Sequence, residues 1–220
     1  MADKTEMQTK GIIFDLDGTL VDTLDDLTVS MNYGLRRFGC PERSRDDCRD
    51  MIGSGILKFA ESALGPEYKH LAESLVEVMI EHYRDHCLVK TVPYPGFPDV
   101  LRTLHQMNIR LAILTNKNQQ PAEVITRHFF GDIFATIIGA KNGQKPKPDP
   151  QAALKILELW NLEPQEVLFV GDSEADIQTA EAANVRCVAC EWGFRSKTQL
   201  LAAGAKMFIQ HPKQILDLVT

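Results

Sequence analysis

With 220 residues, 44% of them hydrophobic, the chain can bury a substantial core as one domain with an insertion or as two modest domains. Its formal net charge of -6 argues against a nucleic-acid partner, because binding a polyanion needs a surplus of Lys and Arg on one face. No apolar run approaches the ~20 residues of a membrane span, and residues 1–10 lack the hydrophobic stretch of a secretory signal. We therefore expect neither nucleic acid nor a membrane as a partner.

The five cysteines are scattered and odd in number, which is typical of a reducing compartment rather than of a disulfide framework. We therefore expect a cytoplasmic protein. Cys187 and Cys190 form a CxxC pair, but they lie in an apolar, strand-like run where positions i and i+3 face opposite sides. Burial as small hydrophobic residues is the favoured interpretation. The oligomeric state stays open between a monomer and a homodimer.

Residues 11–14 form a short apolar run that ends in two carboxylates, Asp15 and Asp17. This pattern is typical of a buried strand that carries acidic side chains at its end. Because alternate residues of a strand share a side, both carboxylates can face the same small volume. They would repel each other there unless a cation or a shared proton lay between them. We therefore expect chemistry at this point of the chain.

Residues 22–90 are expected to be helical, because their apolar positions recur with helical spacing and no strand-like run interrupts them. Asp22 or Thr23 can cap the first helix and Ser44 the second. The four predicted helices cover about 23–38, 45–51, 56–64 and 67–86. Three prolines between residues 93 and 98 then mark a linker or a stiff turn.

After residue 97 the predicted elements alternate between helix and strand, which calls for a parallel sheet covered on both faces. The predicted strands are 109–115, 133–138, 166–170, 185–190 and 207–209, and the predicted helices are 98–107, 120–130, 150–160, 174–183, 197–203 and one from 212 onward. The strand at 11–14 belongs to the same sheet. The expected fold is thus a Rossmann-like, doubly wound α/β core, residues 1–21 and 91–220, with a four-helix cap, residues 22–90, inserted after its first strand.

Polar residues follow the later strands, as expected of a site at the carboxyl ends of a parallel sheet. Thr115 and Asn116 end the run at 109–115, and Asp172 and Asp176 follow the run at 166–170. A Lys-Pro-Lys-Pro segment containing Lys145 lies between them, ahead of a predicted helix.

These residues, in this order, resemble the four motifs of the haloacid dehalogenase-like hydrolase superfamily: DxDGT, a strand-end Ser or Thr, a Lys before a helix, and an acidic GDxxxD. The resemblance covers nearly the whole chain, including the helical cap between the first two motifs. Within the superfamily the chain is similar to phosphoglycolate phosphatases in the segments 52–55, 94–96, 111–117, 145–150 and 203–205.

The resemblance implies a Mg2+-dependent phosphatase that forms an aspartyl-phosphate. Asp15 would be the nucleophile and Asp17 the general acid and base. Lys145 would neutralise charge beside Asp15. Mg2+ would bind Asp15, the carbonyl of Asp17 and Asp172. For Asp176 two roles stay open: a second-layer metal residue, or the capping partner of Ser173 at the start of the next helix.

The expected substrate is a small phosphorylated metabolite, with 2-phosphoglycolate as the best guess. The residues expected to contact it are Gly18, Thr19, Gly53, Ser54, Gly55, Thr115 and Asn116. Lys141 and Lys147 are interpreted as solvated loop charges. The alternatives are a pyrophosphatase, a nucleotide phosphatase, a sugar-phosphate phosphatase or mutase, and, more remotely, a non-catalytic binding protein on this fold. A mutase is disfavoured because the segment 53–56 carries no Arg or Lys to hold a second phosphate.

Overall fold

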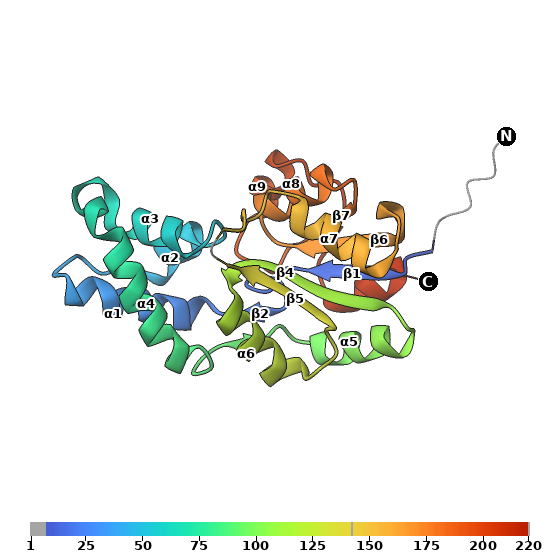
Figure 1. Ribbon diagram of the computed structural model, residues 1–220, viewed down its shortest axis with the longest axis horizontal. Helices are drawn as coiled ribbons and strands as arrows, with labels where there is room; N and C mark the ends of the chain where they lie inside the picture. Colours follow the sequence, from blue (N-terminus) through green and yellow to red (C-terminus); the bar gives the residue numbers. More distant parts are fainter. Residues whose placement is uncertain (1–7, 142, 220) are drawn as a thin grey trace.

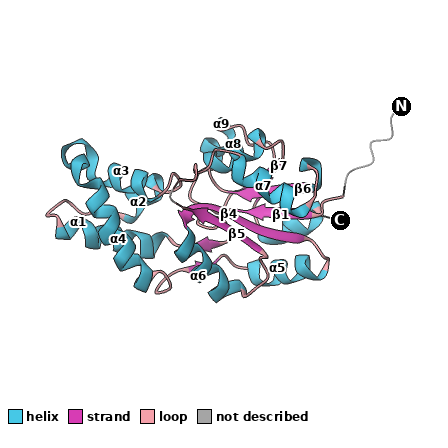
Figure 2. Cartoon of the chain, in the orientation of Figure 1, coloured by secondary structure: helices cyan, strands magenta, loops and turns pink. Residues whose placement is uncertain are grey.

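The centre of the molecule is a six-stranded parallel sheet with the strand order β5-β4-β1-β6-β7-β8 (Figures 1 and 2). The computed structural model describes residues 8–141 and 143–219. The strands are β1 (Gly11–Phe14), β4 (Arg110–Asn118), β5 (Thr136–Ala140), β6 (Val167–Gly171), β7 (Arg186–Cys190) and β8 (Phe208–Ile209). The short strand β1 is central and buried along its whole length, so Asp15 emerges in the middle of the sheet edge.

Helices cover both faces of the sheet, as the predicted α/β class requires. Alternation along β1 sends Ile12 and Phe14 to one face and Ile13 to the other. The first face packs against α5 (Phe97–Gln106), α6 (Gln119–Phe130) and the 3-10 helix η3 (Pro212–Leu218). The second packs against α7 (Gln151–Trp160) and α8 (Glu174–Ala182), and α9 (Lys197–Ala202) lies beside β7 and β8. The doubly wound core is therefore confirmed.

The helices of the insertion share a hydrophobic cluster, which also includes Phe194 from the loop after β7. The insertion contains α1 (Leu24–Arg37), α2 (Arg45–Met51), α3 (Ile56–Tyr68), the 3-10 turn η1 (Lys69–Leu71) and α4 (Ala72–His86). In Figure 1 these helices lie to the left of the sheet, at the end toward which the strand arrows of β1 and β4 point. The carboxyl ends of the strands therefore face the insertion.

Within the insertion, the end of the third helix and the start of the fourth differ from the sequence-based expectation. Helix α3 resumes after a break at Gly65, whose φ of 68° interrupts it, and ends at Tyr68. The fourth helix therefore begins at Ala72 rather than at residue 67.

A two-stranded antiparallel ribbon of β2 (Val21–Asp22) and β3 (Val92–Pro93) joins the two ends of the insertion. The prolines between residues 93 and 98 had predicted a linker or a stiff turn there, without a strand. The ribbon places the two crossings between core and insertion side by side. Among the described residues, no helix is both long and apolar enough to cross a membrane.

Candidate active site

The turn after β1 brings the chain back on itself within a few residues. The carbonyl of Leu16 accepts hydrogen bonds from the amides of Leu20 and Val21. Gly18 has a φ of +82°, and a Cβ there would lie 2.3 Å from Asp172 Oδ2. Only glycine fits this conformation and this contact, so the Asp-Gly pair allows Asp172 to approach the end of β1.

Three buried carboxylates meet at this edge of the sheet: Asp15, Asp172 and Asp176, with one oxygen of each within 4.8 Å of the others. Asp15 follows β1, whereas the other two follow β6. The ammonium of Lys147 lies 2.9 Å from Asp15 Oδ1 and 2.5 Å from Asp176 Oδ1. Three carboxylates and one ammonium leave an excess of two negative charges.

The electrostatics of the cluster favour a further cation. Burial raises the pKa values of Asp15 and Asp172 above the ordinary range, and their carboxylate neighbours raise them further. Lys147 lowers the pKa of Asp15 in part. The residues present therefore fit a hard divalent metal ion, because their ligand atoms are oxygens and its charge would balance the excess.

Asp172 is held in place from two sides. The Thr19 hydroxyl donates to its Oδ1 at 2.9 Å, and the Phe194 amide donates to its Oδ2 at 2.7 Å. Thr19 is fully buried and its amide bonds to Leu16. Gly18 and Thr19 do not line the cavity described below. Both lie against Asp172, and their contact with substrate stays a prediction.

Asp176 is fully buried, and both of its carboxylate oxygens have protein partners. Oδ2 accepts hydrogen bonds from the amide and hydroxyl of Ser173 at the start of α8, which is the capping box that the sequence allowed. Oδ1 pairs with Lys147. Asp176 thus caps its helix and pairs with the lysine.

The lysine of the site is Lys147, not Lys145. The Lys147 side chain is 2% exposed, whereas that of Lys145 is 83% exposed and pairs only with Asp149 among the described residues. The Asn116 side chain explains this selection: its Oδ1 accepts from the Lys147 amide at 2.8 Å, and its Nδ2 donates to the Lys147 carbonyl at 3.1 Å. These two bonds turn Lys147 inward, so the prediction that it is a solvated loop charge is also wrong.

Asp17 points away from the three-carboxylate cluster, toward the insertion. Its oxygens each lie 3.1 Å from the Lys117 ammonium, and Oδ1 also accepts from the Thr23 hydroxyl at 2.8 Å. Lys117 lies near the end of β4, two residues after Thr115. Its ammonium donates to the Tyr83 hydroxyl of α4 at 2.8 Å. The opposing carboxylate and phenol raise the pKa of Lys117 in spite of its burial, so it stays an ammonium. Sequence reasoning noted Lys117 within the strand-end segment but gave it no role.

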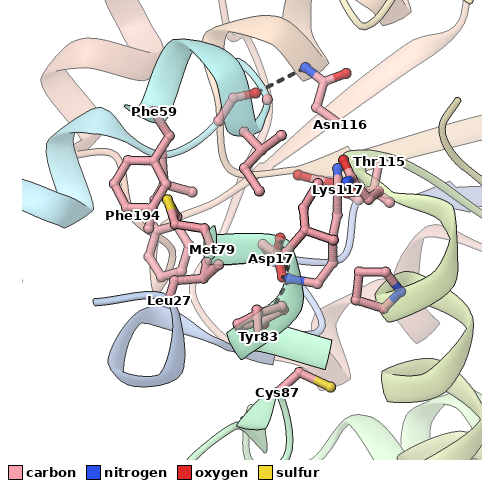
Figure 3. A pocket seen from close by; sticks show the side chains of 18 of the residues that line it. Asp17, Leu27, Phe59, Met79, Tyr83, Cys87, Thr115, Asn116, Lys117 and Phe194 are labelled. Carbon is pink, nitrogen blue, oxygen red and sulfur yellow. Dashed lines mark hydrogen bonds and ion pairs between the residues drawn. The ribbon is translucent and has the colours of Figure 1, made fainter. Parts of the chain in front are cut away.

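A cavity of about 160 Å³ lies between the carboxyl edge of the sheet and the helical insertion. Its core side includes Asp15, Asp17, Thr115, Asn116 and Asp172. The opposite wall is apolar, and Figure 3 shows four of its side chains packed together: Leu27, Phe59, Met79 and Phe194. The hollow is therefore polar at the sheet and apolar toward the insertion.

The loop before α3 meets the cavity only in part. Gly53 and Gly55 line it, whereas Ser54 is exposed and lies outside the lining. Asn116 Nδ2 donates to the Gly53 carbonyl at 2.9 Å (Figure 3). The expectation that Ser54 contacts substrate does not match its outward position.

Arg195, in the loop after β7, also joins core and insertion. Its guanidinium pairs with Glu174 at 3.1 Å and donates to the carbonyls of Arg49 and Ile52 at the end of α2. A guanidinium offers five donors in a fixed plane, which suits several acceptors at once. No motif in the sequence indicated this residue.

Comparison with known proteins agrees with this arrangement. Residues 12–190 match the family model of the haloacid dehalogenase-like hydrolases. Phosphoglycolate phosphatase 1 of Pseudomonas aeruginosa is 33% identical over 213 residues, covering 93% of this chain and 78% of that protein. Phosphoglycolate phosphatase of Aquifex aeolicus is 33% identical over 184 residues, covering 83% and 85%.

Solved structures share the fold. A protein of Lactobacillus delbrueckii subsp. bulgaricus, provisionally named a phosphoglycolate phosphatase, superposes with a TM-score of 0.90 at 28% identity, covering 97% of this chain and 99% of its own. A subfamily IA hydrolase of Geobacter sulfurreducens gives 0.75 at 27% identity, covering 96% and 99%. The chain belongs to the haloacid dehalogenase-like hydrolase family and is a phosphoglycolate phosphatase-like hydrolase within it.

Proposed function

We propose that the protein is a Mg2+-dependent phosphatase that hydrolyses 2-phosphoglycolate through an aspartyl-phosphate on Asp15. One observation carries the proposal: the buried Lys147 lies 2.9 Å from Asp15 at the point where Asp172 also converges. A nucleophilic carboxylate that approaches a phosphate anion needs such positive charge beside it.

In the proposed reaction, an Asp15 oxygen attacks phosphorus, the ester P–O bond breaks, and Asp17 gives a proton to the leaving oxygen. Asp17 then takes a proton from water, whose oxygen attacks phosphorus, releases inorganic phosphate and restores Asp15. Lys147 stays an ammonium and reduces the repulsion between Asp15 and the phosphoryl oxygens. Thr115, at the end of β4, would donate its hydroxyl to a phosphoryl oxygen.

The Asp15 and Asp172 carboxylates and the Asp17 carbonyl would bind Mg2+ directly. Asp176 would contribute from the second layer around the metal. When bound, the metal supplies positive charge that offsets the repulsion between these carboxylates and the phosphoryl group. Carboxylate and carbonyl oxygens are the protein ligands that Mg2+ prefers. The fixed contacts of Asp172 with Thr19 and Phe194 support its part in this set.

The size of the cavity supports a small substrate. About 160 Å³ is well below the roughly 300–1,000 Å³ of pockets that hold drug-sized ligands, which favours a small metabolite. The names of the most similar relatives support 2-phosphoglycolate in particular. The segment 53–56 itself carries no Arg or Lys for a second phosphate, and for this reason we do not propose a mutase.

We also propose a cytoplasmic location. The structure has five free cysteines, four of them buried. Thiols that stay reduced are typical of a reducing compartment.

A phosphate-release screen tests the function. The protein is assayed with and without EDTA on 2-phosphoglycolate, sugar phosphates, nucleotides and pyrophosphate. We expect metal-dependent release, fastest from 2-phosphoglycolate. No metal-dependent release from any compound would contradict the phosphatase, and a preference for a sugar phosphate would contradict only the substrate.

A further inference from the structure

Lys117 is a buried cation on the side of the cavity away from Lys147. Its side chain is 4% exposed, and its ammonium contacts Asp17 from the turn after β1 and Tyr83 from α4 (Figure 3). The ammonium also lies 4.5 Å from the centroid of the Tyr83 ring. Two elements of different parts of the molecule thus meet on this one side chain.

Burying an ammonium costs several kcal/mol before its partners are counted. An apolar side chain in its place would leave the Asp17 carboxylate with the Thr23 hydroxyl but without a cation. Because Lys117 also lines the cavity, the charge that compensates Asp17 borders the space where substrate would bind.

The other cations that line the cavity are occupied elsewhere in the described chain. Arg84 is 53% exposed and pairs with Asp85. Arg195 pairs with Glu174 and with carbonyls of the insertion. Lys117 is the buried cation that faces the cavity beside Asp17.

The position of Asp17 fixes what Lys117 can reach. In the proposed function Asp17 gives its proton to the leaving oxygen, so that oxygen lies within about 2.6–3.2 Å of an Asp17 oxygen. The Lys117 ammonium is 3.1 Å from both Asp17 oxygens. An anionic group two bonds beyond the leaving oxygen is therefore within reach of the same ammonium.

The geometry points to Lys117 as the residue that selects substrates whose leaving group carries a carboxylate one carbon from the ester oxygen. The inference rests on the proposed phosphatase function and assigns the recognition of its leaving group. Tyr83 holds the ammonium from the insertion, and the substrate carboxylate shares it with Asp17. The ammonium donates to Tyr83 and to both Asp17 oxygens. Because it has three donors, a substrate oxygen takes the place of one of the two Asp17 oxygens.

The test compares 2-phosphoglycolate with 2-hydroxyethyl phosphate, in which a neutral CH2OH replaces the carboxylate. We expect Lys117→Met to lower kcat/KM for 2-phosphoglycolate about 100-fold, mainly through KM, because a buried charge loses its partner. For the neutral ester the loss is expected to stay within about tenfold, and Lys117→Arg should restore part of the preference. Arg84→Met, a cation at the exposed end of the cavity, is the matched control and should keep the wild-type ratio. An equal loss on both esters would overturn the inference.

Tyr83→Phe removes only the hydroxyl partner and covers the case in which Lys117→Met does not fold. It should lower kcat/KM for 2-phosphoglycolate about fivefold, the effect of about 1 kcal/mol from one lost hydrogen bond, with less effect on the neutral ester. Equal effects on both esters would count against Lys117 as the selecting residue.

Calorimetry separates this inference from the proposed function, because it needs no turnover. In an Asp15→Asn background, Lys117→Met should weaken the binding of 2-phosphoglycolate and spare that of 2-hydroxyethyl phosphate. Equal weakening of both, or of neither, would overturn the inference. If wild-type protein prefers esters without a carboxylate, the inference fails while the phosphatase function stands.

Discussion

At the scale of single residues, Lys147 provides a direct test of the site, because its neighbour Lys145 is a matched control two positions away. Lys147→Met should lower kcat on 2-phosphoglycolate by about 10²–10³, the usual cost of removing one electrostatic contact to the reacting group. Lys145→Met should stay within about twofold, since its side chain is 83% exposed. Circular dichroism melts of both variants check folding. A larger loss for Lys145→Met would refute the assignment.

The choice between these two lysines could not be made from the sequence. The Lys-Pro unit occurs twice in succession, so both residues have the same local sequence pattern. The distinguishing contact is with Asn116, 31 positions away. By contrast, the positions of Asp15 and Asp172 followed from local rules, because each comes directly after a buried strand.

At the scale of elements, the return from α4 to the core depends on Asp26 in the first turn of α1. Its buried carboxylate accepts hydrogen bonds from the amides of Lys90 and Thr91 and from the Thr91 hydroxyl, at 2.8–3.0 Å. Asp26→Asn should lower the free energy of unfolding by about 2–3 kcal/mol, because bonds to a charged acceptor are lost. Equilibrium unfolding in urea measures this change in the free energy of unfolding. Asp25→Asn is the control: its carboxylate is half-exposed and pairs with Arg45, and the expected change is within about 1 kcal/mol. An equal change in both variants would count against Asp26.

The packing of α1 against α4 should be sensitive to acid through His82. Its ring stacks on Tyr33 and His86, and its Nδ1 lies 2.9 Å from the Ser30 hydroxyl. Burial, and then the nearby His86 and Arg36, lower the pKa of His82, whereas Asp85 opposes the shift. The unfolded chain therefore binds this proton more readily, so stability falls as the pH drops below about 6.5.

Thermal unfolding at several pH values between 7.5 and 5.5 measures this loss. The wild type should lose more stability over that range than His82→Asn, and His70→Asn, at an exposed site on the same insertion, should follow the wild type. If the stability of the wild type and of His82→Asn falls equally with pH, His82 does not contribute to the loss of stability in acid.

The sequence predicted the start of a helix best where a capping motif marks it. Helix α2 begins at Arg45 as predicted because Ser44 and Asp47 form its capping box. The ribbon of β2 and β3 was missed, since strands of two residues carry no periodicity. The last helix was expected to begin at Pro212, and the structure has a 3-10 helix there. Over seven residues, the spacing of apolar positions does not distinguish the pitch of a 3-10 helix from that of an α-helix.

At the scale of the whole molecule, metal binding should stabilise the fold, because it balances the buried negative charge at the sheet edge. Mg2+ at about 100 times its Kd should raise the free energy of unfolding by about 2.7 kcal/mol. For a chain of this length that corresponds to a rise in Tm of about 5–10 °C. Differential scanning calorimetry with Mg2+ and with EDTA measures the shift. Asp172→Asn should melt higher than wild type in EDTA, since one buried charge is gone, and should lose most of the Mg2+ shift. A full Mg2+ shift in this variant would refute Asp172 as a ligand.

The order of the four motifs also predicted that the insertion lies over the active site, because it leaves the core directly after the catalytic strand. How it contacts the core could not be predicted. Asn116 and Lys117, near the end of β4, and Arg195, in the loop after β7, bond to the insertion, and such contacts depend on side-chain positions that no local pattern describes. The boundaries at residues 22 and 90 stay a prediction.

Covalent capture of the phosphorylated enzyme tests the central claim most directly. Wild type, Asp15→Asn and Asp17→Asn are mixed with p-nitrophenyl phosphate and Mg2+, quenched in acid within milliseconds, and analysed by peptide mass spectrometry. The account predicts a phosphate on Asp15 in the wild type, none in Asp15→Asn, and accumulation in Asp17→Asn, because nitrophenolate leaves without an acid but the aspartyl-phosphate loses its general base. Phosphate on another residue, or turnover by Asp15→Asn at about a tenth of the wild-type rate or more, would contradict it.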